Sequence, residues 1–563
     1  MKNTKLREKI EFANVKDLVE KVGDMYKGDY VYTYRVNPRD KDIVKVKYED
    51  FREDVRGLAA EFLARGYKGK HLSVIGKLTY PWILVYWATL SIGSVLVPLD
   101  PEWTVDDLSD TLVKADAAAL FLGKELSEKA ADLEAKTGIK DITVIDGENY
   151  EGIMSLIEAG KKRIAEGDRT YFENEPDPDV LSLLVFTSGT TGKGKGVMLS
   201  QTNVLTDLSD IIPYMDFDKK TIALLPPHHT YGSSVAILGQ TSIGSEIYIS
   251  AGIKYIQKEL KEQKPGHIVL VPLYLETFYR KIKANIKDQG KEKLVENTMK
   301  VSNGLRKMGI DRRRKLFKAI LEAFGGNTHM VISGGAPISQ EIMDFFDGIG
   351  ISVLNGYGIT ECAPIIAVNH SKWIVPGSVG FPLNICDVRI DEPNEDGEGE
   401  ICVKGSNVML GYYKDEETTK EAFTEDGYFR TGDYGKFDKH GALYITGRKK
   451  NLIILSNGKN VYPEEIETEL ASVPGVVDII VYEGQSKRGV ENNKIVAEVY
   501  PDKDFIEKNN IEDVQSYLQE FVNEYNRTAV PYKKIGILKI RDEEFPKNTL
   551  RKILRFKLDM TID

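Results

Sequence analysis

The chain has 563 residues, and because single hydrophobic cores stop growing at about 250–300 residues, we expect more than one domain. The composition, 42% hydrophobic and 29% charged, is that of a globular protein, and the net charge of −10 argues against general nucleic-acid binding. The three cysteines, Cys362, Cys386 and Cys402, have no C-x-x-C spacing, so the sequence predicts neither a disulfide framework nor a zinc site. Because the N-terminus lacks the apolar core of a signal peptide, we expect a cytoplasmic protein; its oligomeric state stays undetermined.

Residues 78–99 carry no charge and are numerous enough to cross a bilayer. Pro81 stands where a helix would begin, Gly93 would interrupt it, and residues 95–97 have the pattern of a strand. A buried helix followed by a buried parallel strand has the same hydropathy as a membrane span. We therefore expect this segment to belong to the core.

Short apolar strands alternate with amphipathic helices along the first two thirds of the chain. The predicted helices include 54–65 and 340–346, and the predicted strands are 71–75, 95–97, 118–121, 141–145, 181–186, 268–271, 330–332 and 351–354. This alternation predicts an α/β fold with mostly parallel sheets covered by helices on both faces.

Three polar, glycine-rich segments follow predicted strands, at 186–196, 333–337 and 355–361. The first, FTSGTTGKGKG, offers backbone N–H groups, hydroxyl donors and lysine charge, a combination suited to phosphate. It is neither a P-loop, because no Gly-Lys pair is followed by Ser or Thr, nor the dinucleotide fingerprint, because its spacing is G-x-G-x-G. Since ligands of parallel α/β sheets bind at the carboxyl ends of strands, we expect the three segments to share one crevice.

From about residue 377 onward, the pattern of predicted strands and helices changes. Short strands, glycines and acidic turns indicate a β-rich subdomain over about 377–447. A charged connector at 447–450 then precedes a strand–helix pattern typical of a small α+β domain, with predicted elements at 478–482, 494–500 and 511–525. We therefore expect an N-terminal domain over 1–447 and a C-terminal domain over 448–563.

Eight motifs in a fixed order carry a family resemblance: 187–196, LPPHHTYG at 225–232, SGGAP at 333–337, NGYGITE at 355–361, 399–412, YFRTGD at 428–433, GRKKNLI at 447–453, and 546–555. With these motifs the chain resembles the adenylate-forming ligases, and within them the long- or medium-chain acyl-CoA synthetases. The resemblance covers nearly the whole chain. It implies a large N-terminal body and a mobile C-terminal lid that rotates about a hinge at Lys450.

The resemblance also implies the reaction. A substrate carboxylate attacks the α-phosphorus of ATP, pyrophosphate leaves, and the acyl-adenylate passes its acyl group to CoA, so the implied ligands are ATP, Mg²⁺ and CoA. This chain has Gly194 where the family usually has proline. The residues that the resemblance assigns to ATP or AMP are Thr187, Ser188, Gly189, Thr190, Thr191, Lys195, Gly335, Ala336, Asn355, Gly356, Tyr357, Asp433 and Arg448.

Single residues receive further roles from the resemblance. Glu361 would help to hold Mg²⁺, Thr360 would contact the α-phosphate, and Lys552 would bridge the carboxylate and the α-phosphate. His229 would divide the nucleotide site from the acyl and CoA tunnels. The residues assigned to the CoA side are Asn457 and Gly458.

Neighbouring residues compete for two of these roles. His228 stands beside His229, and the charge run around Lys552 also holds Lys547 and Arg551. Arg551 occupies a position that is usually glycine in the family. The motif register favours His229 and Lys552.

The overall similarity to that branch of the family implies a fatty acid as the acid substrate. Residues 231–234 contain no carboxylate to hold an α-amino group, which argues against an amino acid. If the next segment is an α-helix, small residues on one face leave a narrow groove for an alkyl chain, or else pack the helix closely on a neighbour. These residues are Gly232, Ala236 and Gly239.

Alternative functions stay open at this level. A fatty acyl-AMP or acyl-carrier-protein ligase would share the adenylation motifs, although residues 455–462 resemble the CoA-using pattern. A CoA ligase for an aryl or other small acid is a further alternative. A non-catalytic binding protein would be expected to lack Lys552 or Glu361, and both are present.

Residues 280–318 hold fourteen lysines and arginines against four acidic residues, in a protein of net charge −10. One interpretation is a solvated helical surface. The other is a peripheral contact with anionic lipid headgroups at the inner face of the membrane, where fatty acid could be collected.

Overall fold

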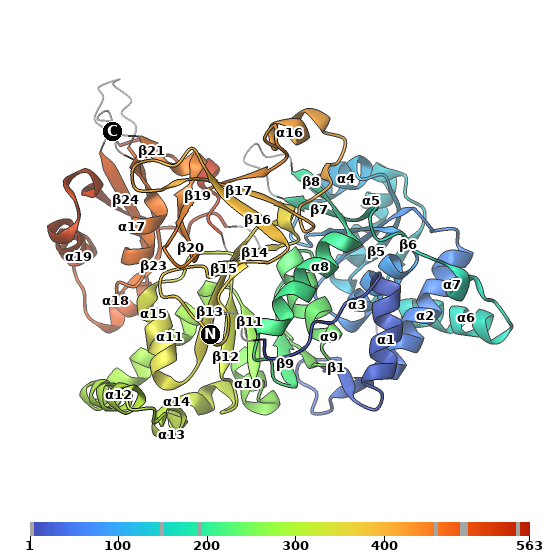
Figure 1. Ribbon diagram of the computed structural model, residues 1–563, viewed down its shortest axis with the longest axis horizontal. Helices are drawn as coiled ribbons and strands as arrows, with labels where there is room; N and C mark the ends of the chain where they lie inside the picture. Colours follow the sequence, from blue (N-terminus) through green and yellow to red (C-terminus); the bar gives the residue numbers. More distant parts are fainter. Residues whose placement is uncertain are drawn as a thin grey trace.

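Seven strands form the largest sheet in the described part of the chain, which comprises residues 5–146, 151–187, 194–454, 460–484, 494–547 and 552–562 (Figure 1). From β7 to β6 the strands run parallel, whereas β8 pairs antiparallel with β7, and the edge strand β18 pairs antiparallel with β8. In spatial order they are β18 (Gly411–Tyr412), β8 (Lys195–Ser200), β7 (Leu181–Thr187), β4 (Val95–Leu99), β3 (His71–Ile75), β5 (Ala117–Leu122) and β6 (Ile142–Val144).

Helices cover both faces of this sheet, because its strands are apolar on both sides. In β5, Ala119 and Phe121 join one core cluster, while the alternating Leu120 and Leu122 join another. The first cluster includes α1 (Val15–Met25), α2 (Tyr48–Ala64), α3 (Tyr80–Ser91), α6 (Glu151–Ala165) and α8 (Gln201–Ile211). The second includes α4 (Val105–Lys114) and α5 (Ala130–Thr137).

The uncharged segment 78–99 lies inside this core, as predicted. All twelve residues of α3 are buried, Thr79 caps the helix through its hydroxyl group, and all residues of β4 are buried. Across the described residues, no helix is both long and apolar enough to cross a membrane.

Two smaller sheets continue the N-terminal domain. One has the order β2 (Val44–Lys47), β1 (Tyr30–Tyr34), β10 (Glu246–Ile249) and β9 (Lys220–Ala223). The other has the order β11 (His267–Leu270), β12 (Met330–Ser333), β13 (Ser352–Gly358), β14 (Ile365–Val368) and β15 (Phe381–Pro382). The strands β9 and β11 adjoin, because Thr221 Oγ1 donates a hydrogen bond to His267 O at 3.1 Å.

Helices α10 (Ile256–Gln263), α11 (Pro272–Asp288) and α15 (Gln340–Ile349) form a core with this second sheet. After α11 the chain makes a peripheral group of helices that lies at the lower edge of the molecule in Figure 1. Its members are α12 (Glu292–Lys307), α13 (Arg313–Leu316) and α14 (Lys318–Leu321).

The β-rich region is an antiparallel sheet of β16 (Cys386–Asp391), β17 (Gly399–Gly405), β19 (Phe429–Phe437) and β20 (Leu443–Arg448). After it, residues from Ile453 to Leu538 build a separate hydrophobic core. Its elements include α17 (Pro463–Leu470), α19 (Val514–Thr528) and the sheet of β23 (Val476–Glu483), β24 (Ile495–Pro501) and β25 (Ile535–Ile540), while α18 (Lys503–Lys508) lies outside this core. The α/β class with a large N-terminal and a smaller C-terminal domain is confirmed.

Two side chains anchor the connector between the two parts. Lys449 Nζ lies 2.7 Å from Glu400 of β17, and Asn451 Nδ2 donates to Glu464 of α17 at 2.6 Å. Lys450 lies between these two anchored residues. The N-terminal domain therefore holds the chain up to Lys449, and the C-terminal domain holds it from Asn451.

Helix α11 supplies a direct contact between the domains. Arg280 Nη1 donates to Val476 O of β23 at 3.0 Å, and Asp288 forms an ion pair with Lys508 of α18 at 2.9 Å. The C-terminal domain lies above this helix in Figure 1. These contacts belong to the particular domain arrangement that the structure shows.

Helices α2 and α6 cross where two glycines meet. A Cβ atom on Gly160 would overlap the carbonyl oxygen of Gly57, and backbone atoms cannot give way as a flexible side chain can. We expect Gly160→Ala to lower the free energy of unfolding by about 1–3 kcal/mol, because the helices must separate. Thermal unfolding measured by circular dichroism would show a lower midpoint.

A matched control is Gly304→Ala in α12, where a Cβ atom would meet nothing within 4 Å. This change should leave the midpoint unchanged or raise it, since alanine favours the helix by up to about 1 kcal/mol over glycine. Equal midpoints in the two variants would show that the α2–α6 crossing is not close-packed.

Candidate functional site

The three segments predicted to share a crevice follow β7, β12 and β13, and the segment 409–412 connects the turn after β13 to β8. Met409 N donates to Glu361 O at 2.8 Å, and Leu410 N donates to Met198 O of β8 at 2.9 Å. Glu361 belongs to a short 3₁₀ turn, Thr360–Cys362, that follows β13. The two hydrogen bonds hold this turn, with Thr360 and Glu361, beside the strand that begins at Lys195.

Residues 355–358 form a strand, and their prediction as a loop was wrong. In the first half of β13, Ser333 of β12 pairs with Asn355 in parallel; in the second half, Gly356 and Tyr357 pair with β14 in antiparallel register. The change of partner lets the strand continue past the edge of β12. Tyr357 is thereby held on a rigid element.

Tyr412 lies between Glu361 and Lys195, which belongs to the glycine-rich segment 186–196. Tyr412 received no role in the sequence analysis. Its hydroxyl group donates to Glu361 Oε1 at 3.0 Å, and Lys195 Nζ lies 4.8 Å from its ring centroid. Burial raises the pKa of Glu361, and burial together with the Glu361 charge raises the pKa of Tyr412. A cation at Glu361 would offset the cost of this half-buried carboxylate.

Asp433 is buried and is held from two sides. Tyr357 Oη donates to Asp433 Oδ2 at 2.7 Å, and Arg448 Nε lies 3.1 Å from Asp433 Oδ1. The pairing of β19 with β20 sets Asp433 directly opposite Arg448. The charge of Asp433 raises the pKa of Arg448, and burial followed by this charge raises the pKa of Tyr357.

Lys552 of the C-terminal domain reaches the same group. It keeps contact with solvent, yet protein surrounds it closely enough that partial burial, followed by the charge of Arg448, lowers its pKa to about 8. Asp433 acts in the opposite direction, and Lys450 adds to the lowering. The charges of Arg448, Asp433 and Lys450 therefore all act on Lys552.

The competing lysine is engaged elsewhere. Lys547 Nζ lies 2.6 Å from Asp478 and 2.8 Å from Glu544, both in its own domain. Arg551 lies outside the described residues. The ion pairs of Lys547 agree with the motif register, which favours Lys552 over Lys547 as the bridging lysine.

The two histidines differ in their surroundings. His228 is buried, lies 3.6 Å from Asp100 Oδ2 through its Nε2, and has its pKa lowered to about 4 by burial. His229 is less buried, and its pKa is lowered by burial, by His228 and also by the charge of Lys552. The charge of Lys552 thus acts on His229, whereas His228 lies against Asp100 of its own domain.

Tyr231 ties the segment after these histidines to the strand ends. Its hydroxyl group lies within hydrogen-bond distance of Leu270 O (3.1 Å) and Ile332 O (3.2 Å), and its ring lies 3.2 Å from the position of a Cβ atom on Gly334. A side chain at Gly334 would therefore displace the ring. The next two residues, Gly335 and Ala336, are exposed.

The α-helical spacing expected for the small residues Gly232, Ala236 and Gly239 was wrong. Residues Tyr231–Gly239 form a π-helix, whose i→i+5 hydrogen bonds widen the turn, so positions seven apart, such as Gly232 and Gly239, no longer share one face. A Cβ atom on Gly232 would overlap Pro226 O, and one on Gly239 would lie 3.1 Å from Leu208. Both glycines thus pack closely on neighbouring chain, as the second interpretation expects, and the alkyl groove stays a prediction.

Several predicted residues lie outside the described part of the chain and stay predictions: Ser188, Gly189, Thr190, Thr191, Asn457 and Gly458. Within the described ranges no group of three or more metal-ligating side chains occurs. A metal ion at Glu361 would therefore take most of its ligands from substrate and water, as Mg²⁺ commonly does.

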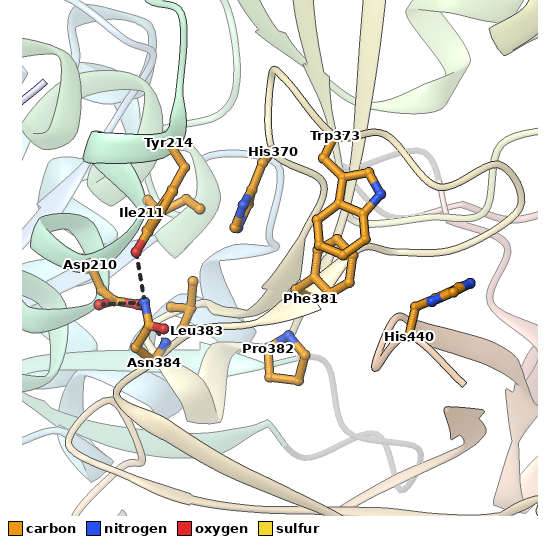
Figure 2. A pocket seen from close by; sticks show the side chains of 10 residues that line it. All are labelled: Asp210, Ile211, Tyr214, His370, Trp373, Phe381, Pro382, Leu383, Asn384 and His440. Carbon is orange, nitrogen blue, oxygen red and sulfur yellow. Dashed lines mark hydrogen bonds between the residues drawn. The ribbon is translucent and has the colours of Figure 1, made fainter. Parts of the chain in front are cut away.

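A separate pocket of about 200 Å³ shares no residue with the crevice (Figure 2). The rings of Tyr214 and His370 stack at 4.4 Å on one side, and those of Trp373 and Phe381 lie 4.1 Å apart on the other. In its lining, the Asn384 side chain donates to Asp210 and Tyr214. These polar groups satisfy one another, which fits a structural role.

Comparisons with known proteins agree with this geometry. FadD15 of Mycobacterium bovis, named a long-chain fatty acid–CoA ligase, is 28% identical over 452 residues, covering 76% of this chain and 73% of that protein. AEE15 of Arabidopsis thaliana, named a chloroplastic long-chain fatty acid–[acyl-carrier-protein] ligase, is 25% identical and covers 95% and 83%. ATP-bound MatB from Rhodopseudomonas palustris has the same fold, with a TM-score of 0.74 at 24% identity over 96% of this chain and 97% of that one. Residues 21–413 match the model of the AMP-binding enzymes, and the chain belongs to this family.

Proposed function

We propose that the chain is an AMP-forming acid–CoA ligase that activates a fatty acid. A carboxylate oxygen attacks the α-phosphorus of ATP, the bond to pyrophosphate breaks, and acyl-AMP forms. The thiol of CoA then attacks the acyl carbon, loses its proton, and AMP leaves. The observation that carries the proposal is the charged cluster at the domain boundary, where Tyr357 and Arg448 hold Asp433 and the charge of Lys552 acts on His229.

Like-charge repulsion is the main physical obstacle in the first step. A carboxylate at about 4 Å from one phosphate charge is repelled by roughly 4 kcal/mol at an effective dielectric of about 20. Positive groups that are placed beforehand offset this repulsion without reorganising during the reaction. Lys552 from one domain and Lys195 from the other are suited to this task.

The nucleotide would bind along β13 and β19. Asp433 can accept hydrogen bonds from ribose hydroxyl groups, and Tyr357 can lie against adenine. Asn355 is buried and its Oδ1 atom has no hydrogen-bond partner among the described residues, so it suits the amino group of a purine. Glu361 would hold Mg²⁺, which neutralises phosphate charge when bound.

The identity of the acid and of the acceptor rests on relatives. FadD15 is named for long-chain fatty acids and CoA, and this supports the same pair here. AEE15 is named for an acyl-carrier-protein acceptor, which keeps that alternative open. Measuring thioester formation with CoA and with acyl carrier protein, across acids of different length, decides both points.

Two domain arrangements would serve the two half-reactions. The arrangement with Lys552 at the crevice suits adenylation, and rotation about Lys450 would remove that cation and open the site to the CoA thiol. Rotation would also separate Arg280 from Val476 O, since these atoms belong to different domains.

The first prediction concerns products and metal. With ATP, Mg²⁺ and a fatty acid, the protein should form AMP and pyrophosphate, and Glu361→Gln should slow adenylation and raise the Mg²⁺ concentration that is needed. Nucleotide chromatography and a pyrophosphate assay over a Mg²⁺ titration measure both. ADP with orthophosphate would overturn the adenylation mechanism, and an unchanged Mg²⁺ dependence would remove Glu361 from the metal site.

The second prediction concerns pH. Below pH 8 Lys552 is protonated, and it loses its proton near pH 8, whereas an ordinary lysine stays charged to about 10.5. The kcat/KM of adenylation, which reports on the free enzyme, should therefore fall as pH rises through 8. Pyrophosphate release measured through the alkaline range tests this.

Lys552→Arg is the control for the pH profile, because a guanidinium group stays protonated throughout. Its absolute rate should be lower, yet the decline near pH 8 should disappear. A decline that persists unchanged in this variant would assign the pH effect to another group.

The third prediction separates the half-reactions. Lys552→Ala should slow acyl-AMP formation by roughly 10²–10³-fold, as loss of one charge-stabilising group typically does, yet still convert supplied acyl-AMP and CoA to acyl-CoA. Lys450→Pro, which restricts φ at the hinge, should keep adenylation and lose thioester formation. Synthetic acyl-AMP allows each half to be followed alone.

Lys450→Ala is the matched control for the hinge, because it removes the same side chain without restricting φ. It should retain both half-reactions. If Lys552→Ala impairs both halves equally, the lysine has a structural role and the two-arrangement mechanism fails.

A further inference from the structure

Helix α12 carries two parallel rows of exposed side chains, one apolar and one basic. Both rows have a spacing of seven residues, which is close to two helical turns, so the members of each row lie above one another. The apolar row is Leu294, Val301 and the residue directly after the helix, Met308, which are 63%, 61% and 68% exposed. The basic row is Lys293, Lys300 and Lys307, all of them exposed.

The opposite side of the helix faces the protein and fixes its orientation. Ser302 is fully buried, and Val295 and Met299 pack against the core that α11 and α15 form. The Met299 side chain lies 3.5 Å from the position of a Cβ atom on Gly348 of α15. Both rows therefore point away from the body, at the periphery seen in Figure 1.

The arginines of the same region have a different role. Arg306 and Arg313 pair with Asp347 of α15, and Arg314 donates to the carbonyl groups of Gly326, Thr328 and Gly350. These arginines hold the helices to the body. Neutralising Arg313 and Arg314 would therefore disturb the fold rather than isolate a surface effect.

The lysines of the basic row are available to a partner. In the described part of the chain, no carboxylate lies within ion-pair distance of Lys293, Lys300 or Lys307. The whole segment 280–318 is strongly positive in a protein whose net charge is −10. An anionic partner is thus attracted to this face and repelled by the remainder of the molecule.

We propose that α12 docks on the surface of an anionic lipid bilayer and lies in the plane of the interface. A helix with an apolar row beside a lysine row matches this environment, since the apolar side chains enter the headgroup boundary. The lysine stems extend beside them and keep their ammonium groups at the lipid phosphates. This role is independent of the proposed reaction.

Vesicle co-sedimentation tests the proposal with the full-length protein. Wild-type protein should bind vesicles of phosphatidylcholine mixed with phosphatidylglycerol and should not bind pure phosphatidylcholine vesicles. The triple variant Lys293→Gln, Lys300→Gln and Lys307→Gln should lose about fivefold in partitioning per lysine. The matched control neutralises exposed lysines elsewhere, Lys68→Gln, Lys420→Gln and Lys439→Gln, and should bind like wild type.

A second variant tests the apolar row. Leu294→Gln, Val301→Gln and Met308→Gln should weaken binding at high salt, where the electrostatic attraction is screened. Val113→Gln with Ile253→Gln, at positions 55% and 56% exposed on other elements, should have no effect.

Activity on a soluble short-chain acid should be unchanged in every variant, which separates loss of docking from loss of folding. Two outcomes overturn the proposal: wild-type protein that ignores anionic vesicles, or an apolar-row variant that binds like wild type at high salt. In the second case the vesicles attract the lysines by charge alone, as the surface of an acidic protein would also do. Helix α12 then does not enter a bilayer.

Discussion

The buried carboxylate of Asp433 is the constraint on which the site depends. Burying an ionised group costs several kcal/mol unless partners compensate it. Here Tyr357 donates one hydrogen bond and Arg448 supplies a charged partner, while Lys552 adds positive potential from the other domain. The sheet of β13 and the β-rich sheet must therefore keep a fixed relation, because each supplies a partner of one carboxylate.

Local sequence patterns predicted the parallel strands of the largest sheet and the site motifs that follow strands, because buried parallel strands have continuous apolar sequences. The strand 71–75 was predicted with its observed bounds. What failed depended on partners distant in sequence. The Gly-Tyr-Gly segment of β13 has weak strand character by itself and becomes a strand through β14. The segment 231–239 fits an α-helix by composition, yet packing against Pro226 and Leu208 accompanies a π-helix.

The choice among neighbouring residues of one type also depended on tertiary contacts. Lys547 and Lys552 are equivalent as charges in a basic run, and the ion pair of Lys547 with Asp478 distinguishes them. Tyr412 could be identified only from its contacts with Glu361 and Lys195. The arginines near residue 313 have the sequence pattern of a uniform basic surface. In the structure Arg313 pairs with Asp347, and Arg314 donates a hydrogen bond to a carbonyl group.

The anchoring of Lys449 to Glu400 and of Asn451 to Glu464 leaves one residue between two rigid bodies. If the C-terminal domain rotates as proposed, this connection would act as a swivel: the displacement of any atom grows with its distance from the axis, so a moderate change of two dihedral angles would carry remote side chains over long paths. Little chain is released or ordered during the movement, and its conformational-entropy cost is correspondingly small. The relative populations of the arrangements are then governed by surface contacts such as those of α11, each of which is individually weak.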